Sequence, residues 1–461
     1  MTKPRFRRRI VLASIAGVAT VGLAAGCAPG EPAAPTTTPA DPGTSATAPA
    51  LNTDPATMGD VELVLWDQET RGSQNDALEA LNQAFQDKYP NITIKRTSQS
   101  FDDLKAQVSL ALSGEDVPDV VQVNNARGDM GQYVKAGQLT DLTPYAEAYG
   151  WADRFPASVL SKVRYSADAA TFGDGNLYGL PQTGEIVGIF YSASKLDKIG
   201  GKAPDSWEEY LALLDTAKAA GEQPMILGNV ESWPALHVFG PLQGHFVAAQ
   251  DIVNLGMGNA GASWLSDGNV AAMTQFAKWG AEGYFGSSPN GLDYDLAWSE
   301  FTKGTGVFLP GGSWLGADLE AAMGDDLHFM APPPGIDGTP ATTGGTGIPF
   351  SIPAKAKNKD AAAAYIDFIT NDDAMQVIAD NGGMPVLRTA ELAPESGVQN
   401  EIYTAFDLVS NNGTLLPYLD YATPSFAATA GQGLQEALGA QRTPEEVLQA
   451  FEDDYQAFIG G

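Results

Sequence analysis

The stretch VELVLW at residues 61–66 is almost entirely apolar, which is typical of a strand buried on both faces of a parallel sheet. Apolar residues then recur at helical spacing, with Ser73 as the expected N-cap, and a second predicted strand, ITIKRT, follows at residues 92–97. Another helical pattern ends at Gly114 and leads to a third predicted strand within PDVVQV, residues 118–123. This β-α-β-α-β order predicts an α/β fold built on a wound parallel sheet.

The composition predicts a folded protein and excludes one class of function. The chain has 461 residues, of which 44% are hydrophobic, and at roughly 150 residues per domain it should form about two or three domains. It carries 56 Asp and Glu against 26 Lys and Arg, a formal net charge of −30. Because nucleic-acid-binding proteins need clustered Lys and Arg, this charge argues against a nucleic-acid partner.

Few side chains are suited to metal binding or redox chemistry. The single cysteine, Cys27, excludes an internal disulfide and any multi-cysteine metal site. The three histidines, His237, His245 and His328, form no HExxH pair. The sequence therefore predicts no metal and no cofactor. Acidic residues are so numerous that the carboxylate pair of a secreted glycosidase stays an open alternative.

The N-terminus has the pattern of an export signal. Residues 1–26 combine a basic head with an apolar run at 10–25, which is shorter than the ~20 residues that a membrane-spanning helix needs. The following LAAGC, residues 23–27, resembles a bacterial lipobox, although Leu stands one residue earlier than in the usual pattern. This resemblance implies a lipid on Cys27. The RR pair at residues 8–9 resembles a twin-arginine signal, so the export route, Sec or twin-arginine, stays open.

A tether is expected between the lipid and the folded body. Residues 28–57 contain seven Pro, seven Thr and eight Ala with almost no large apolar side chain, so they cannot bury a core. We therefore expect residues 27–57 to form a flexible tether. Since the signal carries five basic residues and no acid, its removal makes the net charge −35.

Tryptophans beside small polar residues suggest a ligand. Trp233 lies in ESWP, and Trp314 in GGSWLG. Rings presented by such loops suit a sugar, whose C–H faces stack on them while its hydroxyls pair with polar side chains. Packing in the core is the alternative for each ring.

Several ordered segments resemble one family. PDVV at residues 118–121, GDGNLYGLP at 173–181, GSW at 312–314 and IPAKAKNKD at 352–360 are similar, in this order, to segments of the extracellular solute-binding proteins (family 1) of carbohydrate ABC importers, here of the bacterial lipoprotein type. The likeness covers roughly residues 60–460.

The resemblance implies a two-lobed α/β fold of the periplasmic-binding-protein type II, with each lobe a sheet flanked by helices and a hinge between them. The N-terminal lobe would comprise residues 58–185 and 347–398, and the C-terminal lobe 186–346 and 399–461. A sugar would bind in the cleft between them. The ligand-binding residues that the family pattern implies are Asp67, Gln68, Glu69, Arg71, Asn124, Asn125, Arg127, Glu185, Trp233, Trp314 and Met384.

The function implied is transport and not catalysis. A monomer, anchored outside the cytoplasm to the cell membrane by a lipid on Cys27, would capture a neutral mono- or oligosaccharide and deliver it to ABC importer permease subunits. A secreted glycosidase is the alternative, and a binding protein for a non-sugar solute is a further one.

Overall fold

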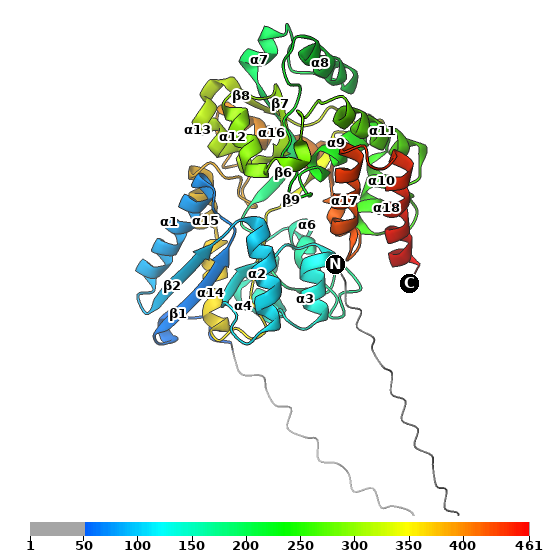
Figure 1. Cartoon of the computed structure of the whole chain (residues 1–461). Coiled ribbons are helices and arrows are strands. Elements are labelled where there is room, and N and C mark those ends of the chain that lie inside the picture. Colours follow the sequence, from blue (N-terminus) through cyan, green and yellow to red (C-terminus); the bar gives the residue numbers. More distant parts are fainter. Residues whose placement is uncertain (1–50, 461) are drawn as a thin grey trace, which may run out of the picture. The chain divides into compact units, whose positions relative to one another are not determined.

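The computed structural model describes residues 51–460, so the predicted signal peptide and Cys27 lie outside the described residues. Within this part, the strands form two main sheets, one with the order β10-β3-β1-β2 and one with the order β11-β9-β6-β7, to which β8 adds by pairing with β6. We call each sheet, with the helices packed on it, the first and the second lobe (Figure 1).

The first lobe is built on the predicted parallel strands. β1 (Val61–Asp67) pairs in parallel with β2 (Ile92–Ser98) and β3 (Val120–Gln122), and β10 (Phe350–Ser351) adds antiparallel to β3. The helices α1 (Gly72–Lys88), α14 (Lys359–Ile369) and α15 (Asp372–Asp380) cover one face, with α2 (Phe101–Ser113) on the other. The prediction of these three strands and of the α/β class is confirmed.

The second lobe is built around β6 (Gly184–Ser192). It pairs antiparallel with β7 (Phe308–Gly312), β8 (Leu327–Met330) and β9 (Ala341–Thr346), while β11 (Thr414–Leu416) pairs in parallel with β9. The helices that pack on this sheet or on one another beside it are α9 (Leu236–Phe246), α11 (Asp267–Ala281), α12 (Tyr294–Thr302), α13 (Gly316–Met323), α16 (Gly397–Asn412), α17 (Phe426–Leu438) and α18 (Pro444–Ile459).

The remaining α-helices complete both lobes. They are α3 (Gln132–Lys135), α4 (Thr143–Tyr149), α5 (Trp151–Arg154), α6 (Ala157–Leu160), α7 (Ala193–Lys198), α8 (Trp207–Ala219) and α10 (Ala249–Met257). A two-stranded sheet, β4 (Arg164–Tyr165) with β5 (Asn176–Leu177), lies just before the chain enters β6.

The structure shortens the expected tether. Pro55 is buried in a 3-10 helix, η1 (Pro55–Thr57), and the backbone N–H of Asn52 donates to Oδ2 of Asp360 at 3.1 Å. Residues 51–57 therefore belong to the folded first lobe and not to the tether, because a single proline ring and a few polar contacts suffice to fix a short segment against a helix.

The predicted cap of the first helix is also wrong. Arg71, and not Ser73, holds the N-cap position of α1, and it makes no side-chain cap hydrogen bond. Asp318, on α13 of the second lobe, lies at this helix start, and its Oδ2 is buried with no hydrogen-bond partner among the described residues. A β-carbon on Gly72 would lie 3.0 Å from Oδ1 of Asp318. A carboxylate of the other lobe thus lies at the first turn of α1, and no local sequence pattern encodes this contact.

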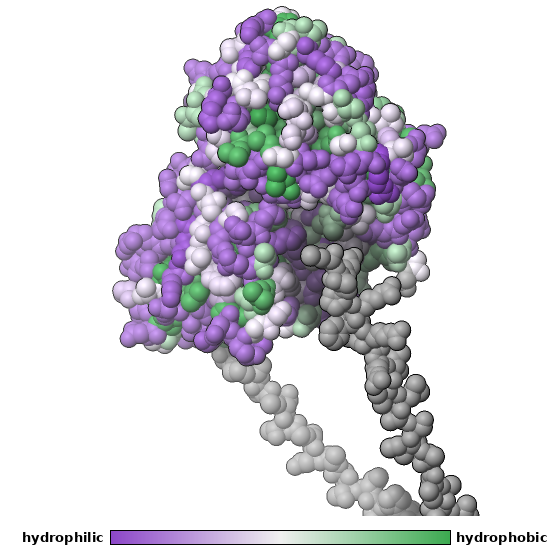
Figure 2. All heavy atoms as spheres, in the orientation of Figure 1, coloured by the Kyte–Doolittle hydropathy of each residue, from purple (hydrophilic) through white to green (hydrophobic). Residues whose placement is uncertain are grey.

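The surface is largely polar. The face in Figure 2 is mostly hydrophilic, with small and separate hydrophobic patches. No helix between residues 51 and 460 combines the length and the apolar character that crossing a bilayer requires.

Candidate functional site

A pocket of about 720 Å³, including its opening to solvent, lies between the two lobes. Residues from strand ends, loops and helix starts of both lobes line it. They are Gln68, Arg71, Phe101, Asn124, Asn125, Glu185, Trp233, Leu236, His237, Trp314, Thr346, Ile348, Tyr418, Asp420 and Tyr421.

Aromatic rings of the second lobe form one wall. Nε1 of Trp314 donates to the hydroxyl oxygen of Tyr294 at 2.8 Å, which fixes the indole. The ring of His237 lies 5.3 Å from that of Trp314 and 5.3 Å from that of Trp233, centroid to centroid. A β-carbon on Gly312 would come within 2.0 Å of the Trp314 ring, so only glycine permits this position of the indole.

Polar side chains of the first lobe face these rings from the loops after β1 and β3. The backbone N–H of Gln68 donates to Oε1 of Gln122 at 2.8 Å, which holds the loop after β1. Arg71 reaches across to the second lobe, where its Nη2 lies 3.1 Å from Oδ1 of Asp295. Nδ2 of Asn124 donates to Oδ2 of Asp129 at 2.8 Å, so the direction of this amide is set.

Glu185 lies where the chain enters β6, at the boundary between the lobes. The hydroxyl of Tyr418 donates to its Oε2 at 3.2 Å. Burial raises the pKa of Glu185 to about 7, and the carboxylate of Glu69 adds to the rise. The side chain can therefore exchange a proton near neutral pH, and it accepts hydrogen bonds in its ionised form.

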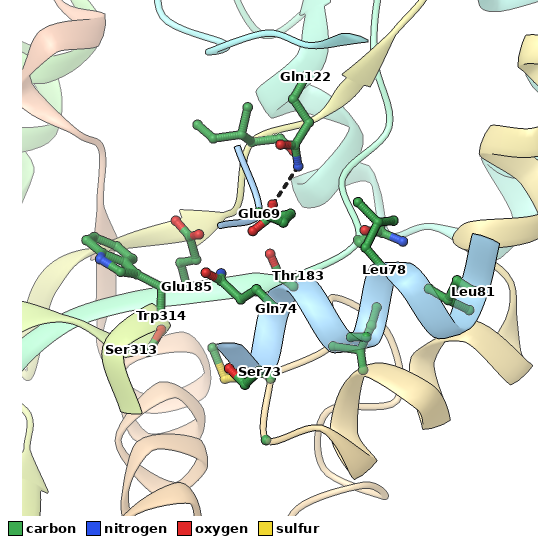
Figure 3. A pocket seen from close by; sticks show the side chains of 18 residues that line it. Glu69, Ser73, Gln74, Leu78, Leu81, Gln122, Thr183, Glu185, Ser313 and Trp314 are labelled. Carbon is green, nitrogen blue, oxygen red and sulfur yellow. Dashed lines mark hydrogen bonds between the residues drawn. The ribbon is translucent and has the colours of Figure 1, made fainter. Parts of the chain in front are cut away.

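A second, inner pocket of about 650 Å³ adjoins the first, since Glu185, Trp314 and Ile348 line both. Glu69 lies at its mouth, where Nε2 of Gln122 donates to its Oε1 at 2.7 Å (Figure 3). Burial raises the pKa of Glu69. Met384 belongs to the apolar floor of this inner pocket.

The pockets bring most of the predicted ligand residues together. Gln68, Arg71, Asn124, Asn125, Glu185, Trp233 and Trp314 line the outer pocket, and Glu69, Glu185, Trp314 and Met384 line the inner one. Whether each contacts a ligand stays a prediction.

Two predicted residues line neither pocket. Asp67 is fully buried, and its two oxygens accept from Nε and Nη2 of Arg96, both at 2.7 Å. Arg127 packs its guanidinium 4.9 Å from the centroid of the Phe458 ring and donates to the carbonyl of Met257 at 3.3 Å. Both side chains hold the loops and lobes in place, and we leave them out of the proposed ligand contacts.

Sequence reasoning missed several lining residues. His237 lies four residues after Trp233, in the first turn of α9, whereas Trp233 precedes this helix. Tyr418, Asp420 and Tyr421 come from the segment after β11, where two aromatic residues follow a proline closely. Nothing in that segment alone says that it reaches the pocket.

Burial also changes the pKa values of two further pocket residues, His237 and Asp420. Burial lowers the pKa of His237 to about 3, so this ring is neutral at pH 7. Burial also raises the pKa of Asp420 to about 6. Among residues 51–460, no group of three or more His, Cys, Asp or Glu side chains is arranged to hold a metal ion.

Comparisons with known proteins agree with this geometry. The family model of the bacterial extracellular solute-binding protein matches residues 71–376, about two thirds of the chain. A "Multiple sugar-binding protein" of Streptococcus mutans is 27% identical over 74% of this chain and 80% of its own length. An uncharacterized ABC transporter extracellular-binding protein of Pyrococcus horikoshii is 24% identical over 78% of this chain and 79% of its own.

Solved structures share the fold. A chitin oligosaccharide binding protein superposes with a TM-score of 0.73 at 20% identity, over 86% of this chain and 99% of its own. The bacterial solute receptor AcbH, described with an exclusive preference for β-D-galactopyranose, gives 0.73 at 18% identity, over 87% of this chain and 100% of its own. With two sheets flanked by helices and a pocket between them, and with a family match over two thirds of its length, the chain belongs to the bacterial extracellular solute-binding protein family.

Proposed function

We propose that this protein binds a sugar or short oligosaccharide between its two lobes and delivers it, chemically unchanged, to the permease of an ABC transporter. The observation that carries the proposal is the outer pocket itself. Trp233 and Trp314 offer ring faces to a pyranose, while Gln68, Asn124 and Glu185 offer hydrogen-bonding groups beside them. The names of the relatives support a sugar as the ligand.

The ligand would act by holding the lobes together. Gln68, Arg71 and Asn124 come from the first lobe, and Trp233, Trp314 and Tyr418 from the second. A ligand that contacts both sets stabilises only the closed arrangement, so binding shifts the equilibrium towards it. The permease then distinguishes the closed, loaded form from the open one.

The location follows from the N-terminal sequence. We propose that the protein acts as a monomer outside the cytoplasm and that a lipid on Cys27 anchors it to the cell membrane, with residues 28–50 as the tether. A mobile but anchored receptor stays near its permease.

A thermal-shift screen followed by calorimetry tests the proposal. Purified residues 51–461 would be heated with a panel of mono- and oligosaccharides, with amino acids and polyamines as controls. A ligand at 100 times its Kd adds about 2.7 kcal/mol of stability, which gives a clear rise in melting temperature. Mass spectrometry after overnight incubation should return the sugar intact. Cleavage would favour a glycosidase, and a response to the controls alone would favour a non-sugar solute.

A further inference from the structure

The place where the two pockets meet is acidic. Glu69, Glu185 and Asp420 line the pockets, and Arg71 is the only Lys or Arg among the lining residues. Nη2 of Arg71 pairs with Asp295 at 3.1 Å and the guanidinium lies 5.8 Å from the centroid of the Tyr294 ring, while its buried Nε has no partner among the described residues. Arg96 also lies near Glu69, but it pairs with Asp67, so three lining carboxyl groups face one lining cation.

Two buried acceptor atoms at this place have no hydrogen-bond donor among the described residues. Oε1 of Glu69 accepts from Gln122, but Oε2 of Glu69 is buried and has no partner among the described residues. The same holds for Oε1 of Gln74, on the first turns of α1. Both side chains line the inner pocket and lie close to Glu185 and Thr183 in Figure 3. Buried polar atoms without partners are costly, so such a group of acceptors indicates a donor that arrives with the ligand.

We propose that the ligand carries a protonated amino group, as an amino sugar does, and that this group binds between Glu69 and Glu185. The inference rests on the proposed sugar-binding function. It replaces the neutral sugar that the sequence predicts with a sugar that carries an amino group. An ammonium group has three donors and one positive charge, which match the two carboxylates and the amide oxygen of Gln74. The rest of the sugar then lies in the outer pocket against Trp314 and Trp233.

The titration of the site gives independent support. Burial raises the pKa of both Glu69 and Glu185, the latter to about 7. The titratable groups around Glu185 are Glu69 and Arg71 on the loop after β1, Tyr294 on α12, and Tyr418 and Tyr421 after β11. Those around Glu69 also include Asp67 and Arg96, which pair with each other. A ligand cation beside these carboxylates lowers their pKa values again, so binding at pH 6.5 should release protons to the buffer.

Matched sugars test the inference. Calorimetry at pH 6.5 would compare glucosamine with glucose, the fully deacetylated chitobiose with cellobiose and with diacetylchitobiose, and 1-deoxynojirimycin with glucose, each in two buffers of different protonation enthalpy. We expect at least one amine to bind about 10- to 100-fold more tightly than its neutral partner, with net proton release, as a charge-assisted hydrogen bond in a buried site provides. A neutral sugar that binds as tightly as its amine counterparts would overturn the inference and leave the proposed function intact. Binding of no sugar of either kind would overturn both.

Two variants locate the amine. Glu185→Gln keeps the shape and a hydrogen-bonding oxygen but removes the charge, so the amine-to-neutral affinity ratio should fall about tenfold towards one. Glu147→Gln makes the same change of net charge on the exposed face of α4, outside both pockets, and should leave the ratio unchanged. Because the ratio compares two ligands on one variant, partial unfolding does not alter it. An unchanged ratio in both Glu185→Gln and Glu69→Gln would overturn the assigned position.

Discussion

The hydroxyl of Tyr421 donates a hydrogen bond to Oδ1 of Asn125 at 2.8 Å, and both residues are buried. Asn125 follows β3 in the first lobe, and Tyr421 belongs to η7 (Leu419–Tyr421) in the second. Asn125 also accepts, at its carbonyl oxygen, from the hydroxyl of Tyr165 at 2.6 Å, within its own lobe. One residue thus makes a bond between the lobes and a bond inside one lobe.

Removing each of these two hydrogen bonds in turn distinguishes an effect on the closure of the lobes from an effect on folding. In Tyr421→Phe the bond between the lobes is lost. Because the proposed opening of the lobes would break this bond in the ligand-free protein, we expect ligand affinity to fall roughly 5- to 30-fold while the ligand-free melting temperature hardly changes. In the matched variant Tyr165→Phe we expect the reverse, a lower melting temperature with affinity nearly kept. Calorimetry and thermal melts on both variants measure this. Equal effects of the two substitutions would contradict closure of the lobes around the ligand.

Asp67 should prove to be a structural residue. Removing one partner of a buried ion pair leaves the other charge unpaired, so Asp67→Asn should lower the free energy of unfolding by about 3 kcal/mol, through Arg96. Glu79→Gln is the control, because Glu79 also contacts Arg96 but is 58% exposed, and its loss should cost less than about 1 kcal/mol. Urea unfolding of the ligand-free variants measures both values. Lost affinity with full stability would instead return Asp67 to the ligand site.

Trp314 should contribute to both folding and binding. It packs with the core of the second lobe and also lines both pockets. Trp314→Ala should therefore lower the ligand-free stability by about 3 kcal/mol and weaken sugar binding about 5- to 150-fold. Trp298→Ala, in the same core but outside both pockets, should lower stability alone. Melting curves and calorimetry on the same samples distinguish the outcomes, and equal affinity in the two variants would remove Trp314 from the binding site.

Cys27 should determine where the protein is found. If a lipid anchors the chain there, Cys27→Ala should appear in the medium or remain as the unprocessed precursor, whereas the wild type fractionates with membranes. Cell fractionation followed by immunoblotting measures this. A variant of mature size in the membrane fraction would contradict the lipid anchor.

The sequence predicted the fold well because its signals are local. The apolar run at residues 61–66 and the alternation at 92–97 place strands correctly, as the parallel register between Val61 and Ile92 shows. The site was predicted only in part. Asp67 looked like a loop residue, but Arg96 lies on the neighbouring strand and reaches it only after the sheet forms.

The missing part of the site depends on tertiary structure. Tyr418 reaches Glu185 from 233 residues away along the chain. Asp318 lies at the start of the helix α1 although it belongs to the other lobe. Such contacts follow from how two lobes meet and leave no pattern at either residue.

The ionisation of Glu185 should make the stability of the ligand-free protein depend on pH. Burial raises its pKa from the ordinary value of 4.5 to about 7, so between these values the folded chain keeps a proton that the unfolded chain releases. The contribution of Glu185 to the free energy of unfolding is therefore fully present below pH 4.5 and is lost as the pH rises through 7.

Glutamine cannot ionise, so the difference in the free energy of unfolding between Glu185→Gln and the wild type should be near zero at pH 4.5 and should grow, in favour of the variant, to about 1–2 kcal/mol at pH 8. His237 has the opposite effect, because its lowered pKa makes the free energy of unfolding rise between pH 3 and 6.5. This rise occurs in both proteins and therefore cancels when the variant is compared with the wild type. Urea unfolding at a series of pH values, with Glu147→Gln as the control for net charge, measures the curve. A difference that stays constant with pH would mean that Glu185 is already ionised in the folded protein well below neutral pH.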